Sequence, residues 1–287
     1  MFKPQMAHEQ LLSIDLEDWH TSAFLRQYVR PEAVVHQLEQ STPPILDLLA
    51  ELGASATFFI LGSAAEVHPA LIKRIAAEGH EIASHGYSHT PLWDLTPDSF
   101  RAEIVLTNSI LQDLTGHRVK GFRAPYCSLQ ADTAWMLDVL EEEGFAYDSS
   151  MFPLRTTLYG VNGAPVGAYG ISSADIMHHS PSAKLLEIPF TVFQQWGLTV
   201  PCTGGVYGRL LPFRLLQWLL QQTARHRPIN FYFHPWETYA HTPRVNVPWF
   251  NRFITYYNNE DYLPRVRQLG QVFRFTSFEK YLAQQQP

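Results

Sequence analysis

The chain has 287 residues, a length that fits one large α/β domain or two small domains. Hydrophobic residues make up 46% and charged residues 17%, so the chain can bury a sizeable core and is not expected to be disordered. A net charge of −6 argues against a broad nucleic-acid-binding face. No run approaches the roughly 18 apolar residues of a membrane span, and residues 1–10 lack the apolar segment of a signal peptide. These features favour a cytoplasmic enzyme.

The first half of the chain alternates predicted strands and helices. An apolar run at 11–14 predicts a buried strand that ends in acidic residues. A helical pattern begins at Pro43 and ends at Gly53, before a strand at 56–62. The same rhythm continues through a helix at 69–78, a strand at 80–84, a helix at 96–115, a strand at 121–125, a helix at 131–143 and a strand at 145–150.

The second half contains three further strand candidates, at 185–190, 230–234 and 273–278. The alternation along the whole chain predicts a parallel sheet or barrel. The segment 153–184 has no clear periodicity and is interpreted as a long excursion between strands, of a length that is often functional. The mixed aromatic and polar segment 236–257 is interpreted as a lid or a subsite wall.

Two histidines, His85 and His89, follow a predicted strand and lie four residues apart. A lone HxxxH pattern is more often structural than metal-binding. A hydrolytic zinc site uses three protein ligands and leaves one position open for water, so two histidines require one carboxylate. The acidic cluster that follows the first strand offers three candidates.

Asp15, Glu17 and Asp18 place three negative charges within four residues. Such crowding costs stability unless a cation or a basic side chain neutralises it. The alternative interpretation is an acidic helix N-terminus that the helix dipole favours.

Three more polar residues follow predicted strands. Arg123 could orient a carboxylate and keep it ionised, although an ordinary salt bridge is the commoner role. His234 could act as a general acid or base, although a structural histidine is otherwise commoner. Asp148 could pair with either of these two. Because strand ends converge in such folds, this conjunction points to metal-assisted hydrolysis.

The ordered motifs SIDLEDW, SHGYSH, FRAPY and FYFHP resemble the polysaccharide deacetylases of carbohydrate esterase family 4, the NodB homology domain, over residues 10–280. The forms DLEDW, YDSSMFP and FRFTSFEKYL resemble the branch found in exopolysaccharide and exosortase gene clusters. The resemblance implies an α/β fold, a NodB-like distorted (β/α) barrel of about seven strands. It also implies one divalent metal, most often Zn²⁺ with Co²⁺, Ni²⁺ or Mn²⁺ as alternatives, and removal of N-acetyl groups from amino sugars.

The resemblance also assigns roles to residues of this sequence. The second aspartate of the family motif supplies the third metal ligand, and the resemblance assigns this role to Asp18. The two aspartates of the family motif are closer together than Asp15 and Asp18, so Glu17 is the alternative. The family motif with a tryptophan near the acid is not recognisable here. The remaining assignments are Asp15 as general base, His85 and His89 as metal ligands, Arg123 as the residue that holds the base, Tyr126 as a wall and oxyanion donor, and His234 as general acid.

The expected partner is an N-acetylated glycan of a bacterial exopolysaccharide or its precursor, with no nucleic acid and no membrane span. The expected organisation is a single catalytic domain over 1–287, with 153–184 as an insertion and 236–287 as a C-terminal extension. Tryptophans available to stack on sugars are Trp93, Trp196, Trp236 and Trp249. The alternatives are a hydrolase of a small cyclic or N-acyl amide on the same scaffold, and a non-catalytic carbohydrate-binding protein.

Overall fold

A computed structural model describes residues 9–285 of the chain. Its contacts divide the chain into two compact units. Unit 1 contains the described residues up to Thr57, then Gly79–Glu81 and the chain from Cys202 onward. Unit 2 contains Phe58–Glu78 and Ile82–Pro201. The expected single domain, with its insertion and its C-terminal extension, stays a prediction.

Unit 1 is built on three parallel-paired strands, β1 (Gln10–Leu16), β10 (Asn230–Phe233) and β11 (Phe275–Thr276). β1 pairs with both of the others, and its register with β10 sets Ile14 opposite Phe233. Every residue of β1 and β10 is buried, as expected of strands that are covered on both faces. The residues that follow these two strands therefore lie at one edge.

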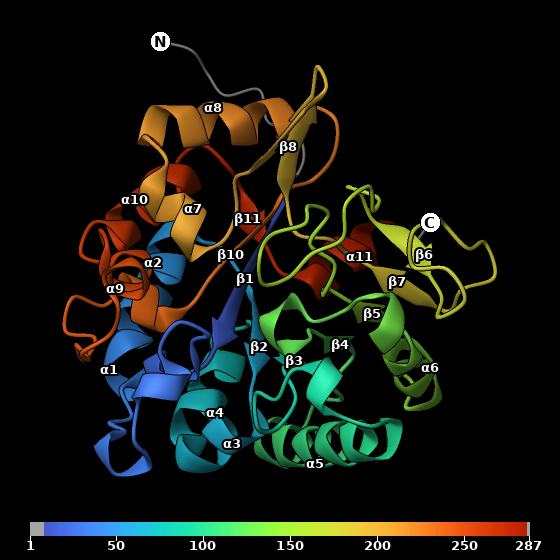
Figure 1. The fold of residues 1–287 in the computed structure, drawn as a ribbon, viewed down its shortest axis with the longest axis horizontal. Coiled ribbons are helices and arrows are strands. Elements are labelled where there is room, and N and C mark those ends of the chain that lie inside the picture. The colour runs from blue at the N-terminus through green and yellow to red at the C-terminus, as the bar shows by residue number, and fades with distance from the viewer. Residues whose placement is uncertain (1–8, 286–287) are drawn as a thin grey trace. The chain divides into compact units, whose positions relative to one another are not determined.

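Helices surround these strands in unit 1. Figure 1 shows β1 and β10 side by side, with α2, α7, α9 and α10 gathered on one side of them. The predicted helix from Pro43 is confirmed as α2, and Gly53 ends it in the left-handed conformation (φ 60°). The α-helices of this unit are α1 (Leu38–Ser41), α2 (Pro43–Leu52), α7 (Gly205–Leu210), α8 (Phe213–Ala224), α9 (Trp249–Tyr256), α10 (Tyr262–Gly270) and α11 (Phe278–Gln285).

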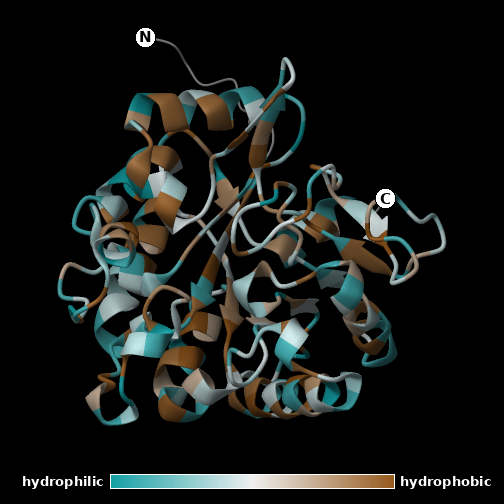
Figure 2. Ribbon diagram, in the orientation of Figure 1, coloured by the Kyte–Doolittle hydropathy of each residue, from teal (hydrophilic) through white to brown (hydrophobic). Residues whose placement is uncertain are grey.

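Unit 2 has a sheet with the strand order β2-β3-β4-β5-β7-β6. β3, β4, β5 and β7 pair in parallel, and β6 is antiparallel to β7. Figure 2 shows hydrophobic residues along strands such as β7. The strands are β2 (Thr57–Ile60), β3 (Glu81–Ser84), β4 (Gly121–Phe122), β5 (Tyr147–Asp148), β6 (Tyr169–Ile171) and β7 (Leu185–Glu187), and β8 (Val192–Gln195) and β9 (Leu198–Pro201) form a separate hairpin.

The helices of unit 2 begin and end close to where the sequence places them. α4 (Pro69–Ala77) and α5 (Pro97–Thr115) both begin at a proline, which suits the first helical turn. α5 is capped by Thr96, whose Oγ1 accepts from the Ser99 backbone, and it ends before Gly116 (φ 74°). The helix expected at 131–143 begins later, as α6 (Trp135–Glu142), because residues 131–133 form a 3-10 turn. The other α-helix is α3 (Gly62–Val67).

Two sequence expectations concern the chain ends and membranes. Residues 1–8, which carry most of the argument about a signal peptide, lie outside the described residues. Within residues 9–285, no helix has the length and apolar character needed to cross a bilayer.

Candidate active site

One group of the predicted site residues lies in unit 1, at the ends of β1 and β10. Because Ile14 pairs with Phe233, Asp15 and His234 follow neighbouring parallel strands. His234 Nε2 lies 3.8 Å from Asp15 Oδ2 and 3.3 Å from Glu17 Oε1. The other ring nitrogen, Nδ1, lies 2.8 Å from Glu237 Oε2. The structure thus brings together two of the predicted residues, the expected base and the expected acid.

The charges around His234 favour its protonated form. Burial alone would lower the pKa of His234, but the carboxylates of Glu237, Glu17 and Asp15 raise the pKa to about 9. Burial alone would raise the pKa of Glu237, but His234 and Arg209 bring it below its ordinary value. Nδ1 therefore donates to an ionised carboxylate, and the proton on Nε2 points toward Asp15 and Glu17. This is the arrangement that a general acid needs.

Arg209 in α7 binds the Glu237 carboxylate oxygen that His234 does not use. The Arg209 side chain is only 1% exposed, and its Nη2 donates to Glu237 Oε1 over 3.1 Å. A Cβ at Gly205 would lie 1.7 Å from Glu237 Oε1, so only glycine fits there. The sequence analysis missed both Glu237 and Arg209. A usable signal was the glutamate three residues after His234, which is the spacing of a capping box, and the structure contains one at the start of η7 (Pro235–Thr238).

Asp18 and Glu17 point to different neighbours within unit 1. Both oxygens of Asp18 are engaged elsewhere, with Oδ2 at 2.7 Å from His36 Nδ1 and Oδ1 accepting from the Gln37 backbone over 2.9 Å. Glu17 instead lies with Asp15 beside His234. β1 ends at Leu16, and the Glu17 backbone N–H donates to the Asp15 carbonyl oxygen over 3.0 Å, so a tight turn brings both carboxylates to the same histidine. The contacts within unit 1 therefore favour Glu17 over Asp18 as the third metal ligand. The role of Asp18 as ligand stays a prediction, and these contacts do not support it.

Another group of the predicted site residues lies in unit 2, where β3 and β4 end. Ser84 pairs with Phe122, which places His85 beside Arg123. His85 Nδ1 lies 2.7 Å from the Arg123 carbonyl oxygen. Because a carbonyl only accepts, Nδ1 carries the proton and Nε2 keeps a lone pair for a metal. One ring nitrogen of His89 lies within 4.8 Å of one of His85, so the two imidazoles fit a single ion.

His89 and Tyr126 share an uncommon backbone conformation. Their φ angles are 60° and 57°, in the left-handed region that side chains other than glycine rarely adopt. Their rings pack edge to face with centroids 4.4 Å apart. Backbone strain of this kind persists where the surroundings impose it, and it gathers at functional sites. The structure thus places the expected oxyanion donor against an expected metal ligand.

Arg123 is held firmly in unit 2. Its guanidinium lies between the rings of Phe59 and Phe190, 4.0 and 4.4 Å from their centroids. Nε donates to the Ser149 carbonyl and Nη2 to Ser149 Oγ. The side chain is 1% exposed, so its orientation is fixed by packing as well as by hydrogen bonds. Such a fixed cation suits the role of orienting a carboxylate.

Asp148 pairs with Glu187, a residue that the sequence analysis did not single out. The register of β5 and β7 sets the two residues opposite one another, and both are fully buried. Asp148 Oδ1 accepts from Ser150 Oγ over 2.6 Å. Burial raises the pKa of Asp148 to about 6, and burial together with the Asp148 charge raises the pKa of Glu187 well above its ordinary value. The pair therefore holds a proton at mildly acidic pH.

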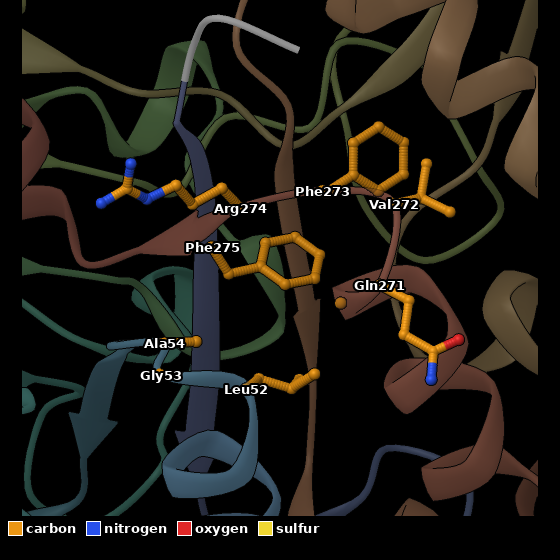
Figure 3. A pocket seen from close by; sticks show the side chains of 9 residues that line it. Leu52, Gly53, Ala54, Gln271, Val272, Phe273, Arg274 and Phe275 are labelled. Atoms are coloured by element: carbon orange, nitrogen blue, oxygen red, sulfur yellow. The ribbon is translucent and has the colours of Figure 1, made fainter. Parts of the chain in front are cut away.

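A cavity of about 230 Å³ lies at the opposite end of β1, where Gln10 pairs with Phe275. Figure 3 shows its lining, which is mostly apolar or backbone and includes Arg274 as its one charged side chain. It contains no histidine, cysteine or carboxylate. The cavity therefore lacks the groups that hydrolysis requires.

Comparison with known sequences matches two families in succession. The family described as "Polysaccharide deacetylase" matches residues 32–147, and "Domain of unknown function (DUF3473)" matches residues 149–283. Residues 32–147 thus match the polysaccharide deacetylase family, and the resemblance to that family read from the motifs is confirmed. The resemblance to the exopolysaccharide and exosortase branch stays a prediction.

Two curated relatives of this deacetylase domain show how far the similarity extends. The chain is 37% identical over 120 residues to the peptidoglycan-N-acetylglucosamine deacetylase of Bacillus cereus, covering 38% of this chain and 44% of that protein. It is 43% identical over 70 residues to the chitooligosaccharide deacetylase of Rhizobium leguminosarum biovar trifolii, covering 24% and 33%. The chain spans less than half the length of these relatives.

Solved structures confirm the predicted α/β, NodB-like fold. The chain aligns with a Mycobacterium smegmatis protein assigned as a polysaccharide deacetylase at a TM-score of 0.61 and 17% identity, over 97% of this chain and 91% of that one. It also aligns with a family 4 pseudoenzyme from Bacillus anthracis at a TM-score of 0.51 and 14% identity, over 98% and 66%. Since a pseudoenzyme has this fold, activity must be argued from the residues of the site.

Proposed function

We propose that this protein is a metal-dependent hydrolase that removes N-acetyl groups from the amino sugars of a bacterial polysaccharide or its precursor. The observation that carries the proposal is His234, which Glu237 holds in its protonated form with Nε2 directed at Asp15 and Glu17. The curated relatives of the domain are named as deacetylases of N-acetylated glycans, which supports the same reaction class.

The ligands proposed for one divalent ion are His85, His89 and Glu17. Two imidazole nitrogens and one carboxylate oxygen form a donor set that suits zinc with one position left open. The lone pair on His85 Nε2 and the engagement of both Asp18 oxygens by His36 and Gln37 support this set. When bound, such an ion lowers the pKa of a water molecule and polarises an acetyl carbonyl.

The side chains then divide the proton transfers of amide hydrolysis. Asp15 accepts the proton of the attacking water, and Arg123 is assigned to hold this base in position. The backbone N–H at Tyr126 donates to the oxyanion that develops on the carbonyl oxygen. His234 donates its Nε2 proton to the departing amine, which would otherwise leave as an unfavourable anion. Each role is matched by the chemistry of the group assigned to it.

The first experiment measures metal content by plasma mass spectrometry together with acetate release from N-acetylated oligosaccharides. We expect about one zinc or similar ion per chain, with loss of the metal in His85→Ala and in Glu17→Gln. Asp18→Asn is the matched control and should keep the metal, because the proposed ion does not use that carboxylate.

The outcomes separate the alternatives. Metal without acetate release from any N-acetylated glycan would favour the hydrolase of a small cyclic or N-acyl amide. Metal loss in Asp18→Asn but not in Glu17→Gln would reverse the ligand assignment. Sugar binding with neither metal nor turnover would favour a carbohydrate-binding protein.

A further inference from the structure

Helix α9 in unit 1 packs Asn251, Thr255 and Tyr256 toward the protein and exposes its three other aromatic residues together with Arg252. Thr255 is fully buried, and Asn251 donates from Nδ2 to the Phe24 carbonyl oxygen over 2.8 Å. The exposed side chains are Trp249 at 78%, Phe250 at 51%, Phe253 at 41% and, directly after the helix, Tyr257 at 44%. A surface helix of a globular protein normally has the reverse arrangement. The inversion indicates that the outer face of α9 is covered by something other than water.

The four exposed aromatic side chains form one stripe, which we call the α9 stripe. With a rotation of about 100° per residue, positions 249, 250, 253 and 257 fall within roughly 100° of one another on the helix. Ring contacts support this, since the centroids of Trp249 and Phe250 lie 5.9 Å apart and those of Phe253 and Tyr257 lie 4.9 Å apart. Contiguous exposed apolar surface of this kind marks an interaction site.

The charge around the α9 stripe identifies the kind of surface that would cover it. The segment 238–259 contains no aspartate or glutamate, and the exposed Glu260 and Asp261 follow it directly. The same segment contains Arg244 and Arg252, both exposed, and Arg252 belongs to α9 itself. Among residues 9–285, neither arginine forms an ion pair. Positive charge therefore lies beside the N-terminal part of the α9 stripe, and the carboxylates follow its C-terminal end.

We propose that the α9 stripe docks on the surface of an anionic lipid bilayer. Tryptophan, tyrosine and phenylalanine side chains partition to the level of the lipid headgroups, and arginines beside them contact lipid phosphates. A neutral glycan would make use of the aromatic rings but not of the two arginines. The inference stands apart from the proposed reaction, because it rests on α9 and not on the candidate active site.

The attachment of α9 would make such docking relevant to the candidate active site. The carbonyl oxygens of Ile254, Thr255 and Tyr257 accept hydrogen bonds from Arg209, over 2.9, 3.1 and 2.7 Å. The same guanidinium donates to Glu237. The docked helix is thus bonded through one buried side chain to the partner of His234, so that a bilayer would hold this part of unit 1 at its surface.

The test is co-sedimentation of the full chain with lipid vesicles. We expect binding to an equal mixture of phosphatidylcholine and phosphatidylglycerol, weak binding to phosphatidylcholine alone, and loss of binding at high salt. The double variant Trp249→Ser, Phe253→Ser should bind at least about tenfold more weakly, and Arg252→Glu should weaken binding to the mixed vesicles. The matched control is Trp196→Ser, which removes an equally prominent tryptophan (74% exposed) from the turn between β8 and β9.

Several results would overturn the proposal. These are no binding to either kind of vesicle, equal loss in Trp196→Ser, or binding that Arg252→Glu leaves unchanged. If soluble N-acetylglucosamine oligomers bind through Trp249 while vesicles do not, the stripe is a glycan platform instead. Circular dichroism checks the fold of each variant, and Arg252→Glu, an exposed single change, keeps the test valid if the double variant does not fold.

Discussion

Each unit buries a glutamate near the end of a strand, and the two glutamates have opposite acidities. Glu237 in unit 1 lies between His234 and Arg209, and its pKa is lowered although the residue is buried. Glu187 in unit 2 lies beside Asp148, and its pKa is raised well above the ordinary value. Burial favours the neutral form of both. The sign of the shift is decided by the charge of the neighbours, which is positive around Glu237 and negative beside Glu187.

The difference separates two functions of a buried carboxyl group. A carboxylate compensated by two cations stays an anion and can fix the tautomer and charge of a histidine. A carboxyl that keeps its proton can join two strand ends by a hydrogen bond. The folded protein loses stability when the pH rises and that proton is lost. Glu237 therefore belongs to the chemistry of the site, and Glu187 belongs to its scaffold. Substitutions in the two clusters should have correspondingly different effects.

The largest effect is expected from His234→Ala. If His234 supplies the proton to the departing amine, turnover should fall by about 10²–10⁴-fold. The protein should still fold and bind metal, because Arg209 continues to neutralise Glu237 and the proposed ligands are unchanged. Acetate release and metal content measured on the same preparation check both statements. Near-normal turnover would remove the general-acid assignment.

A smaller loss is expected from Glu237→Gln. The amide can still accept the proton of His234 Nδ1, but it removes the negative charge that favours the imidazolium, so we expect turnover to fall about 10–100-fold. The kinetic constant to measure is kcat, with KM nearly unchanged, because Glu237 lies behind His234. The matched control is Glu81→Gln, since the Glu81 carboxylate in unit 1 accepts instead from Thr57 Oγ1 and the Glu279 backbone. Equal losses in the two variants would show that Glu237 acts only through stability.

The strand ends could be predicted from the sequence, but the partners behind them could not. Apolar runs followed by polar residues pointed to Asp15 and His234 in unit 1 and to His85 and Arg123 in unit 2, because within each unit parallel strands deliver such residues to one edge. Arg209 could not be found in this way, since it reaches Glu237 from a helix 28 residues earlier. Such a contact depends on packing between distant segments and leaves no local periodicity.

The directions of Glu17 and Asp18 could not be predicted from the sequence. The family pattern of two aspartates favoured Asp18 as the metal ligand. In unit 1 a tight turn, in which the Glu17 N–H donates to the Asp15 carbonyl oxygen, brings Glu17 beside Asp15, while Asp18 lies beside His36. A motif determines residue types only, whereas the direction of each side chain depends on the local turn, so the identity of the ligand stays a proposal.

The smallest predicted effect is a change in how the free energy of unfolding depends on pH, and it comes from Glu187→Gln. The folded-state pKa values of Asp148 and Glu187 are raised, so the folded protein binds more protons than the unfolded chain. Their stabilising contribution is present below the unfolded pKa near 4 and is lost as the pH rises through about 6 for Asp148 and higher for Glu187. Glutamine carries an N–H donor at every pH, so it can donate to Asp148 without needing a proton.

Urea unfolding of both proteins at a series of pH values from 4 to 8 measures this difference. We expect similar free energies of unfolding near pH 4 and a more stable variant near pH 7, because the unmodified pair must lose its proton in a buried site as the pH rises and the glutamine need not. The same substitution at Glu237 should have the opposite sign at pH 7, since it leaves the Arg209 guanidinium without its anion. Curves for Glu187→Gln and the unmodified protein that run parallel from pH 4 to 8 would mean that the pair does not hold a proton. The two glutamates would then differ in neighbours but not in charge.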